Sequence, residues 1–371
     1  MTNHVKNINI KNDYCPSLTQ SNTWLRYRAT GILLFLSKAV DIFASIRDQI
    51  KTLIDKNLII SSKANARKIL INDNYYNVIN GYKDNFIDKS YTPTSINDPD
   101  EKYITGATFD ELYSMYIFDK ELRELFLKYF LIVEEEFKTH LAYEFSLLFG
   151  ECGYLESINF DTSDKKIFDV IDMHSQINHV IYNNRKDDRV VHFYKERNKK
   201  VPIWALVSLF EIGKTRIFYS NCKTSLKRRV AFYYGISPNQ LISMLSVVNM
   251  FRNVCAHNNR LYCYKINDTD KQLSDMPVHT NMGINVCVAP TTGNYFVLGK
   301  KDLFSVVICF KYLLNNNDFI DFFNGINVVI NKLSVSLHTI SVDDVLMKMG
   351  FPLSDLSTGQ HDWKDILTIN K

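Results

Sequence analysis

Apolar residues at helical spacing recur through most of this chain, and this pattern restricts the fold more than any other feature of the sequence. Five segments show it over one helix length each, near residues 46–57, 63–76, 165–181, 302–314 and 319–337. A longer stretch begins at Thr108, a helix-capping residue, and continues through Phe137, so we expect two helices there. Consecutive helices of this number predict an all-α bundle.

The helix with the clearest signals is the one that begins at Pro238. Ser237 is placed to cap it, proline suits the first helical position, and Gln240 completes a capping box. Apolar residues then follow at helical spacing to Cys255, and we place this motif helix at about residues 238–262.

The remaining segments predict a loop, two further helices and a hairpin. Residues 185–192, within a charged segment, show no clear apolar periodicity and predict a solvated loop, whereas a helix is expected from Pro202 to about Gly213 and another before Gly235. Alternating apolar residues within 284–298 predict one small β-hairpin. We therefore divide the chain into an N-terminal extension of uncertain structure, residues 1–42, and an all-α region, residues 43–371.

The composition limits the class of protein. With 371 residues and 46% hydrophobic content the chain can bury a large core, and its net charge of +4 means that any nucleic-acid contact needs a local basic patch. The seven cysteines contain no Cys-x-x-Cys pair, which predicts reduced thiols rather than a zinc site. We find no leader, spanning segment, glycine-rich phosphate loop or dinucleotide fingerprint, and we expect a cytoplasmic protein without a cofactor or a membrane contact.

Arg252 stands in the motif helix where an apolar residue would be expected. Helical geometry places it in one arc with Leu241, Met244, Leu245, Val248, Phe251 and Cys255. Burial of an unpaired guanidinium costs several kcal/mol, so Arg252 must meet a carboxylate, a second chain or a ligand phosphate. Asn253, His257 and Arg260 are expected on a neighbouring face of the same helix.

This arrangement has a structural and a functional interpretation. In the first, Arg252 joins two helices through a buried carboxylate, for which Glu134 is a candidate, and His257 only caps the helix. In the second, the cation and the imidazole act on a phosphodiester. A second Arg-to-His spacing at residues 185–192 shows how short the pattern is, and we discount it. Glu134, Glu135 and Glu136 point in three directions and do not predict a metal site, and Glu134 with Lys138 is an ordinary helical pair.

Two further groups are candidates for RNA binding. Lys223, Lys227, Arg228 and Arg229 precede the motif helix and form either a phosphate-tracking patch or a solvated charged face. Aromatic residues either stack on unpaired bases or pack in the core; they include Tyr75, Tyr76, Tyr82, Phe232, Tyr233 and Tyr234.

Several separate blocks of the sequence resemble the bacterial Abi-like abortive-infection family over roughly residues 45–370. They are N-Y-Y-N-V-I-N-G-Y at 74–82, L-Y at 112–113 through F-D at 118–119 and L-R at 122–123, V-P-I-W at 201–204, F-R-N-V-C-A-H-N-N-R-L-Y at 251–262, G-K-K-D-L-F at 299–304 and M-G-F-P at 349–352. The chain departs from related sequences at Lys138, where arginine is frequent, and residues 1–42 match none of these blocks.

The resemblance extends to the HEPN superfamily, whose helical bundles carry an R-x(4–6)-H motif that cleaves RNA without a metal. It implies a HEPN-like bundle with additional helices, with Arg252, Asn253 and His257 as catalytic residues and Arg260 as an RNA contact. It also implies a toxin-like endoribonuclease that acts in phage defence.

The proposed chemistry needs a proton acceptor at the 2′-hydroxyl, a donor at the departing 5′-oxygen and positive charge on the phosphate. Histidine exchanges protons near neutral pH, and arginine stabilises the phosphorane oxygens. Because one imidazole cannot readily serve both sides of an in-line displacement, we predict a homodimer with a composite site. The alternative is a non-catalytic module on the HEPN scaffold that binds RNA or a toxin–antitoxin partner; a regulatory small RNA or protein is compatible with either.

Overall fold

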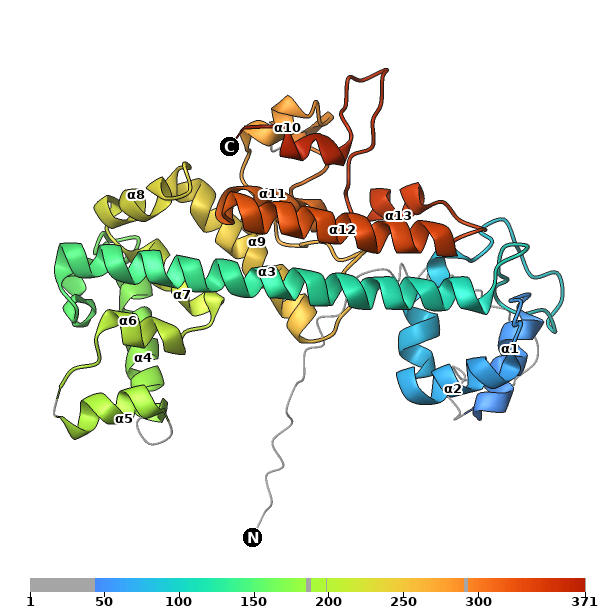
Figure 1. Cartoon of the computed structure of the whole chain (residues 1–371), viewed down its shortest axis with the longest axis horizontal. Coiled ribbons are helices and arrows are strands. Elements are labelled where there is room, and N and C mark those ends of the chain that lie inside the picture. The colour runs from blue at the N-terminus through green and yellow to red at the C-terminus, as the bar shows by residue number, and fades with distance from the viewer. Residues whose placement is uncertain (1–43, 185–187, 198, 290–292, 371) are drawn as a thin grey trace, which may run out of the picture. The chain divides into compact units, whose positions relative to one another are not determined.

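The computed structural model describes residues 44–184, 188–197, 199–289 and 293–370, so the predicted extension at 1–42 lies outside the described residues. The all-α prediction is confirmed, because helices make up most of this region (Figure 1). The helices are α1 (Ile46–Asp55), α2 (Lys63–Asp73), α3 (Phe109–Phe149), α4 (Ile167–Asn184), α5 (Arg189–Glu196), α6 (Ile203–Leu206), α7 (Ile212–Asn221), α8 (Thr224–Phe232), α9 (Pro238–Ala256), α10 (Pro277–Asn281), α11 (Leu303–Leu313), α12 (Asn316–Ser336) and α13 (Val342–Lys348).

The predicted hairpin is also confirmed. Strands β1 (Val286–Ala289) and β2 (Gly293–Phe296) pair antiparallel, with Val286 opposite Phe296. Part of the turn-like cluster that was expected between them lies outside the described residues.

The stretch after Thr108 is one helix of 41 residues, and the prediction of two helices is wrong. Thr108 accepts a hydrogen bond from the Glu111 amide in a capping box, and no glycine or proline interrupts the chain until Gly150, whose φ of 79° ends the helix. At about 1.5 Å per residue α3 is roughly 60 Å long. It runs through the whole region 45–371 as the element on which other helices pack (Figure 1).

Two shorter segments correct the sequence-based expectations. The second half of the predicted loop, residues 189–192, is the start of α5, which Asp188 caps by accepting from the amides of Val190 and Val191, while Val191 is buried. The helix expected from Pro202 ends early, because α6 gives way to a 3₁₀ turn at Val207–Leu209 before α7 begins. At α5 a side-chain cap and a buried valine accompany a helix where the apolar pattern was weak.

Aromatic side chains fill the core between α3, α11 and α12. Phe126 lies 5.1 Å from Phe322, Phe130 lies 5.1 Å from Phe310, and Phe310 lies 4.9 Å from Phe322, each measured between ring centroids. Edge-to-face contacts of this kind add to the burial of apolar area. The motif helix α9 packs against α3, α7 and α11, and α12 lies along α3 (Figure 1).

Candidate active site

The start of α9 forms as the sequence predicts. Ser237 accepts a hydrogen bond from the Gln240 amide at 3.3 Å, and the Gln240 side chain accepts from the Ser237 amide at 2.9 Å. Pro238 occupies the first turn. These contacts fix the register of the helix that carries Arg252 and His257.

The end of α9 differs from the prediction, because the helix stops at Ala256 rather than near residue 262. Asn258 adopts a left-handed φ of 57°. Its amide bonds to the Cys255 carbonyl at 3.1 Å, and the Asn259 amide bonds to the Val254 carbonyl at 3.0 Å. This is the Schellman pattern, and asparagine tolerates it better than most residues do. His257 therefore caps the helix, and Arg260 does not share a helical face with it.

His257 is exposed at this helix end, as are the two asparagines that follow. Asn253, one turn earlier, is partly buried, and its carbonyl accepts the His257 amide at 3.0 Å. The imidazole is thus accessible to a ligand, whereas its backbone is held by the helix.

Arg252 faces Glu134 on α3. Its Nε lies 3.9 Å from Glu134 Oε2, and the two side chains are 24% and 10% exposed. Neither atom has a hydrogen-bond partner, although both are buried. The other carboxylate oxygen, Oε1, accepts from Lys138 Nζ at 2.7 Å. A carboxylate therefore neutralises Arg252, as the structural interpretation expects, but the guanidinium Nε keeps a free donor.

Asp119 holds the chain that follows His257. Its carboxylate is fully buried and accepts from the Tyr262 amide at 2.7 Å and from the Leu261 amide at 3.1 Å. Tyr82 donates to it at 2.7 Å and Arg123 at 2.5 Å. Asp119 and Arg123 belong to the blocks that carry the family resemblance, and the sequence alone assigned them no role.

Arg260 contributes to the same attachment. Its Nη1 donates to the Gly81 carbonyl at 2.9 Å, just after the helical turn at Tyr76–Asn80. The residue is exposed, so an RNA contact by its remaining donors stays a prediction.

The four cations before the motif helix lie near its other end. Arg229 pairs with buried Glu144, which also accepts from Tyr233 at 2.9 Å, and Lys227 donates to the Ser220 carbonyl at 3.3 Å. Lys223 and Arg228 form no ion pair with the described part of the chain. Fourteen residues of α9 separate its first residue from Arg252, a rise of roughly 20 Å. The structure does not bring these cations to the motif.

The candidate stacking residues divide between core and surface. Tyr82, Tyr234 and most of Tyr75 are covered, whereas Tyr76 and Phe232 are exposed by 65% and 83%. Tyr233 already stacks on His140, with ring centroids 4.1 Å apart. Only the exposed members are available to a base.

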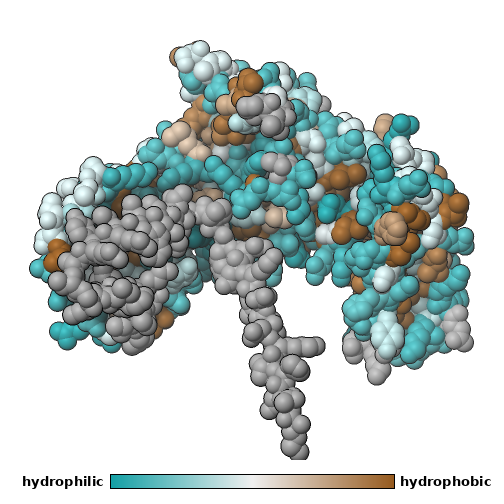
Figure 2. Space-filling view, turned by 180° about the vertical axis from the view of Figure 1, so that it is seen from behind, coloured by the Kyte–Doolittle hydropathy of each residue, from teal (hydrophilic) through white to brown (hydrophobic). Residues whose placement is uncertain are grey.

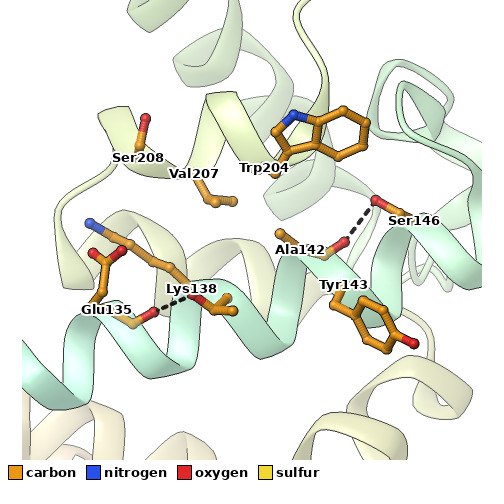
Figure 3. Close-up of a pocket in the computed structure, with 9 residues that line it drawn as sticks. Glu135, Lys138, Ala142, Tyr143, Ser146, Trp204, Val207 and Ser208 are labelled. Atoms are coloured by element: carbon orange, nitrogen blue, oxygen red, sulfur yellow. Dashed lines mark hydrogen bonds between the residues drawn. The ribbon is translucent and has the colours of Figure 1, made fainter.

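Two hollows flank α3, and Glu135 and Thr139 line both of them. One, of about 340 Å³, lies between α3 and α6 and is lined by Lys138, Ala142 and Trp204 (Figure 3). The other, of about 400 Å³, is lined by His140, Tyr233 and Tyr234. Both are within the size range of small-ligand sites. Apolar surface gathers on the side of the molecule that carries α4 to α7 (Figure 2), and Trp204 there is 50% exposed.

Cys255 lies in the motif helix, whereas the other described cysteines and the discounted second motif lie outside that helix. Cys152, Cys222, Cys255, Cys263, Cys287 and Cys309 are free thiols, and Cys15 lies outside the described residues. Burial raises the pKa of the Cys255 thiol, next to Ala256, to about 12. His192 lies on α5, 3.6 Å from Glu196, and Arg185 lies outside the described residues.

The sequence profile of the Abi-like protein family matches residues 68–263, more than half of the chain. The chain belongs to the Abi-like family. The matched region contains Gly81, Asp119, Arg123, the motif helix α9 and Arg260, so the Abi-like signature coincides with the site described above. Membership of this family points to abortive-infection phage defence.

No curated protein and no solved structure matches the chain. Within the described residues, no helix of this Abi-like protein combines the length and the apolar character that crossing a bilayer requires.

Proposed function

We propose that this Abi-like protein is a metal-independent endoribonuclease of the HEPN type that acts in abortive-infection phage defence. His257 is the general acid/base, Arg252 stabilises the scissile phosphate, and Asn253 assists them. The observation that carries the proposal is the buried Arg252 Nε, which has no acceptor in the described structure and lies on the same helix as an exposed imidazole. An ionised donor that lacks an acceptor suits an anionic ligand such as phosphate.

The reaction transfers a phosphoryl group within the RNA. The 2′-oxygen attacks the adjacent phosphorus, the bond to the 5′-oxygen breaks, and the products are a 2′,3′-cyclic phosphate and a 5′-hydroxyl end. One imidazole accepts the proton of the 2′-hydroxyl and a second donates a proton to the departing oxygen. Arginine's planar fork binds the phosphorane oxygens as negative charge develops there.

A homodimer supplies the second imidazole. With one motif in each chain, two copies of the end of α9 meet across a two-fold axis and form a composite site. Light scattering on the active enzyme tests this step. A strictly monomeric active enzyme would contradict the dimer. The roles of His257 and Arg252 would then be tested by their alanine variants alone.

The test of the activity is incubation of purified protein with labelled RNA in EDTA. We expect products that end in cyclic phosphate, and we expect His257→Ala to lose roughly 10²- to 10⁴-fold in rate while the far-ultraviolet circular dichroism stays unchanged. Arg252→Ala should behave similarly. The matched control is His192→Ala, which removes an exposed imidazole from the discounted motif and should cleave like the wild type.

Normal cleavage by both His257→Ala and Arg252→Ala means that the site assignment is wrong. RNA binding without cleavage by the wild type favours the alternative function, a non-catalytic module that holds RNA or a toxin–antitoxin partner. The contact between Arg252 and Glu134 is the observation that supports this alternative, since it gives the arginine a structural role.

A further inference from the structure

The six residues from His257 to Tyr262 connect the end of α9 to a fixed point on α3. At the first end, the amides of His257, Asn258 and Asn259 bond back to the last turn of the helix. At the other end, the amides of Leu261 and Tyr262 donate to Asp119. His257 is therefore held between two attachments, and its side chain lies in the exposed part of the segment.

Both carboxylate oxygens of Asp119 have hydrogen-bond partners. The carboxylate is 0% exposed and receives hydrogen bonds from Tyr82, Arg123 and the two amides. Burial raises the pKa of Asp119, while the Arg123 charge and these hydrogen bonds oppose that rise. Arg123 also donates to the Asn259 carbonyl at 3.5 Å. The pair thus contacts the segment at Asn259, Leu261 and Tyr262.

Neighbouring contacts tie the segment to the turn around residue 82. The Tyr82 and Tyr262 rings stack with centroids 5.7 Å apart, and Asn85 donates to the Tyr262 hydroxyl at 2.9 Å. Arg260 also donates a hydrogen bond to the Gly81 carbonyl. Three stretches that are distant in the sequence therefore converge within a few residues of His257.

We propose that Asp119 and Arg123 are positioning residues that set where the His257 imidazole lies. The inference rests on the proposed function, because it concerns the residue expected to transfer protons. A misplacement of about 1 Å can cost a catalytic site roughly 100-fold in rate, and the loss of one attachment removes a restraint on where the segment lies. Asp119 touches neither substrate nor reacting atoms in this scheme; it acts through the backbone after His257.

The test compares Asp119→Asn with Glu111→Gln. Glu111 is a matched control because it is a buried carboxylate on α3 that accepts from two successive amides, His338 at 2.6 Å and Thr339 at 2.7 Å, in another part of the fold. Both substitutions remove one negative charge and keep an oxygen acceptor. We expect Asp119→Asn to lower kcat by roughly 10- to 100-fold with KM changed less than about threefold, and Glu111→Gln to stay within about threefold in both.

A second measurement does not depend on activity. Hydrogen exchange of the Leu261 and Tyr262 amides should be at least about tenfold faster in Asp119→Asn, and unchanged in Glu111→Gln. If Asp119→Asn does not fold, Arg123→Lys takes its place, since lysine keeps the charge but lacks the guanidinium Nη1, which donates to both Asp119 and Asn259. We expect the same loss in kcat from it.

The outcomes separate the two proposals. An inactive wild type contradicts the proposed function, and the exchange rates then still test the attachment. Wild-type kcat in a folded Asp119→Asn protein, or equal losses in Asp119→Asn and Glu111→Gln, would overturn the positioning role.

Discussion

The long helix α3 carries two buried pairs of a carboxylate and a cation, each four residues apart, and α9 or the segment after it meets both. One is Asp119 with Arg123, and the other is Glu134 with Lys138. Their pair distances, 2.5 and 2.7 Å, are alike, and no side chain in either pair is more than about one tenth exposed. In sequence the two pairs are the same motif.

The two pairs differ in whether all their carboxylate oxygens have hydrogen-bond partners. Around Asp119 both carboxylate oxygens have partners, which are Arg123, the Tyr82 hydroxyl and two backbone amides. At Glu134, by contrast, Oε2 has no hydrogen-bond partner within the described structure. Arg252 lies next to it, and the Arg252 Nε has no hydrogen-bond partner there either. Buried polar atoms without partners are rare and occur where a ligand or strain explains them. The first pair is built to hold the chain, whereas the second leaves a donor for something outside it.

The largest effect we expect is on stability at the first pair. Asp119→Ala leaves the Arg123 guanidinium and two amides buried without an acceptor, which lowers the free energy of unfolding by about 3–5 kcal/mol. Glu134→Ala should cost clearly less, because it leaves no backbone amide without an acceptor and because Arg252 is 24% exposed. Urea unfolding of both variants measures the difference. Equal losses in the free energy of unfolding would mean that the two pairs stabilise the fold equally and do not differ in role.

Capping signals and apolar spacing predicted most of this fold from sequence. The start of α9 followed from Ser237 and Gln240, the hairpin from the alternation within residues 284–298, and the all-α class from the recurring helical spacing. The prediction failed for α3, where we expected a break although no glycine or proline stands between residues 109 and 149. It failed again at the end of α9, although Asn258 and Asn259 are a recognisable stop signal.

The site was predictable only in part. Arg252 was identified because a cation on an apolar arc needs a partner, and Glu134 was one candidate. Asp119 was not, since a carboxylate that binds backbone amides 142 and 143 residues away leaves no local pattern. The cations at Lys223–Arg229 were grouped with the motif because they precede it in sequence, but a helix length separates them.

Another buried carboxylate, Asp302, differs from both pairs because it has no ion pair within the described residues. It accepts from the amides of Gly299 and Ser305, and burial raises its pKa to about 7. The folded state then binds this proton more tightly than the unfolded chain, whose value is 3.8. Stability from this group is present at acid pH and falls as pH rises through 7, by on the order of 2 kcal/mol between pH 5 and 8.

Asp302→Asn should remove this fall. The measurement is the free energy of unfolding of wild type and variant at pH 5 and pH 8, and the difference between the proteins cancels the contribution of other groups such as His279. A variant that loses stability with pH as steeply as the wild type would show that the Asp302 carboxyl stays ionised.

A smaller effect is expected from Tyr82→Phe. The substitution removes one of the donors to Asp119 and keeps the ring that stacks on Tyr262. The loss should be about 1 kcal/mol, the usual value for one hydrogen bond, because the remaining donors still satisfy the carboxylate. Thermal unfolding measures it, with Tyr113→Phe as the control, since its hydroxyl bonds to the more exposed Asp73 at 3.1 Å.

The smallest effect on stability is expected where the effect on function is large. Arg252→Ala removes a guanidinium whose only ionic contact among the described residues is 3.9 Å long, and Glu134 keeps its bond to Lys138. Partly exposed ion pairs of this length contribute less than about 1 kcal/mol, so the free energy of unfolding should change by no more than that. Urea unfolding beside the cleavage assay tests this, and Arg123→Ala is the comparison, because it strips a fully buried carboxylate of its cation. If Arg252→Ala destabilises the protein as much as Arg123→Ala does, the arginine of the motif has a structural role. The unpaired donor at its Nε then no longer supports an anionic ligand.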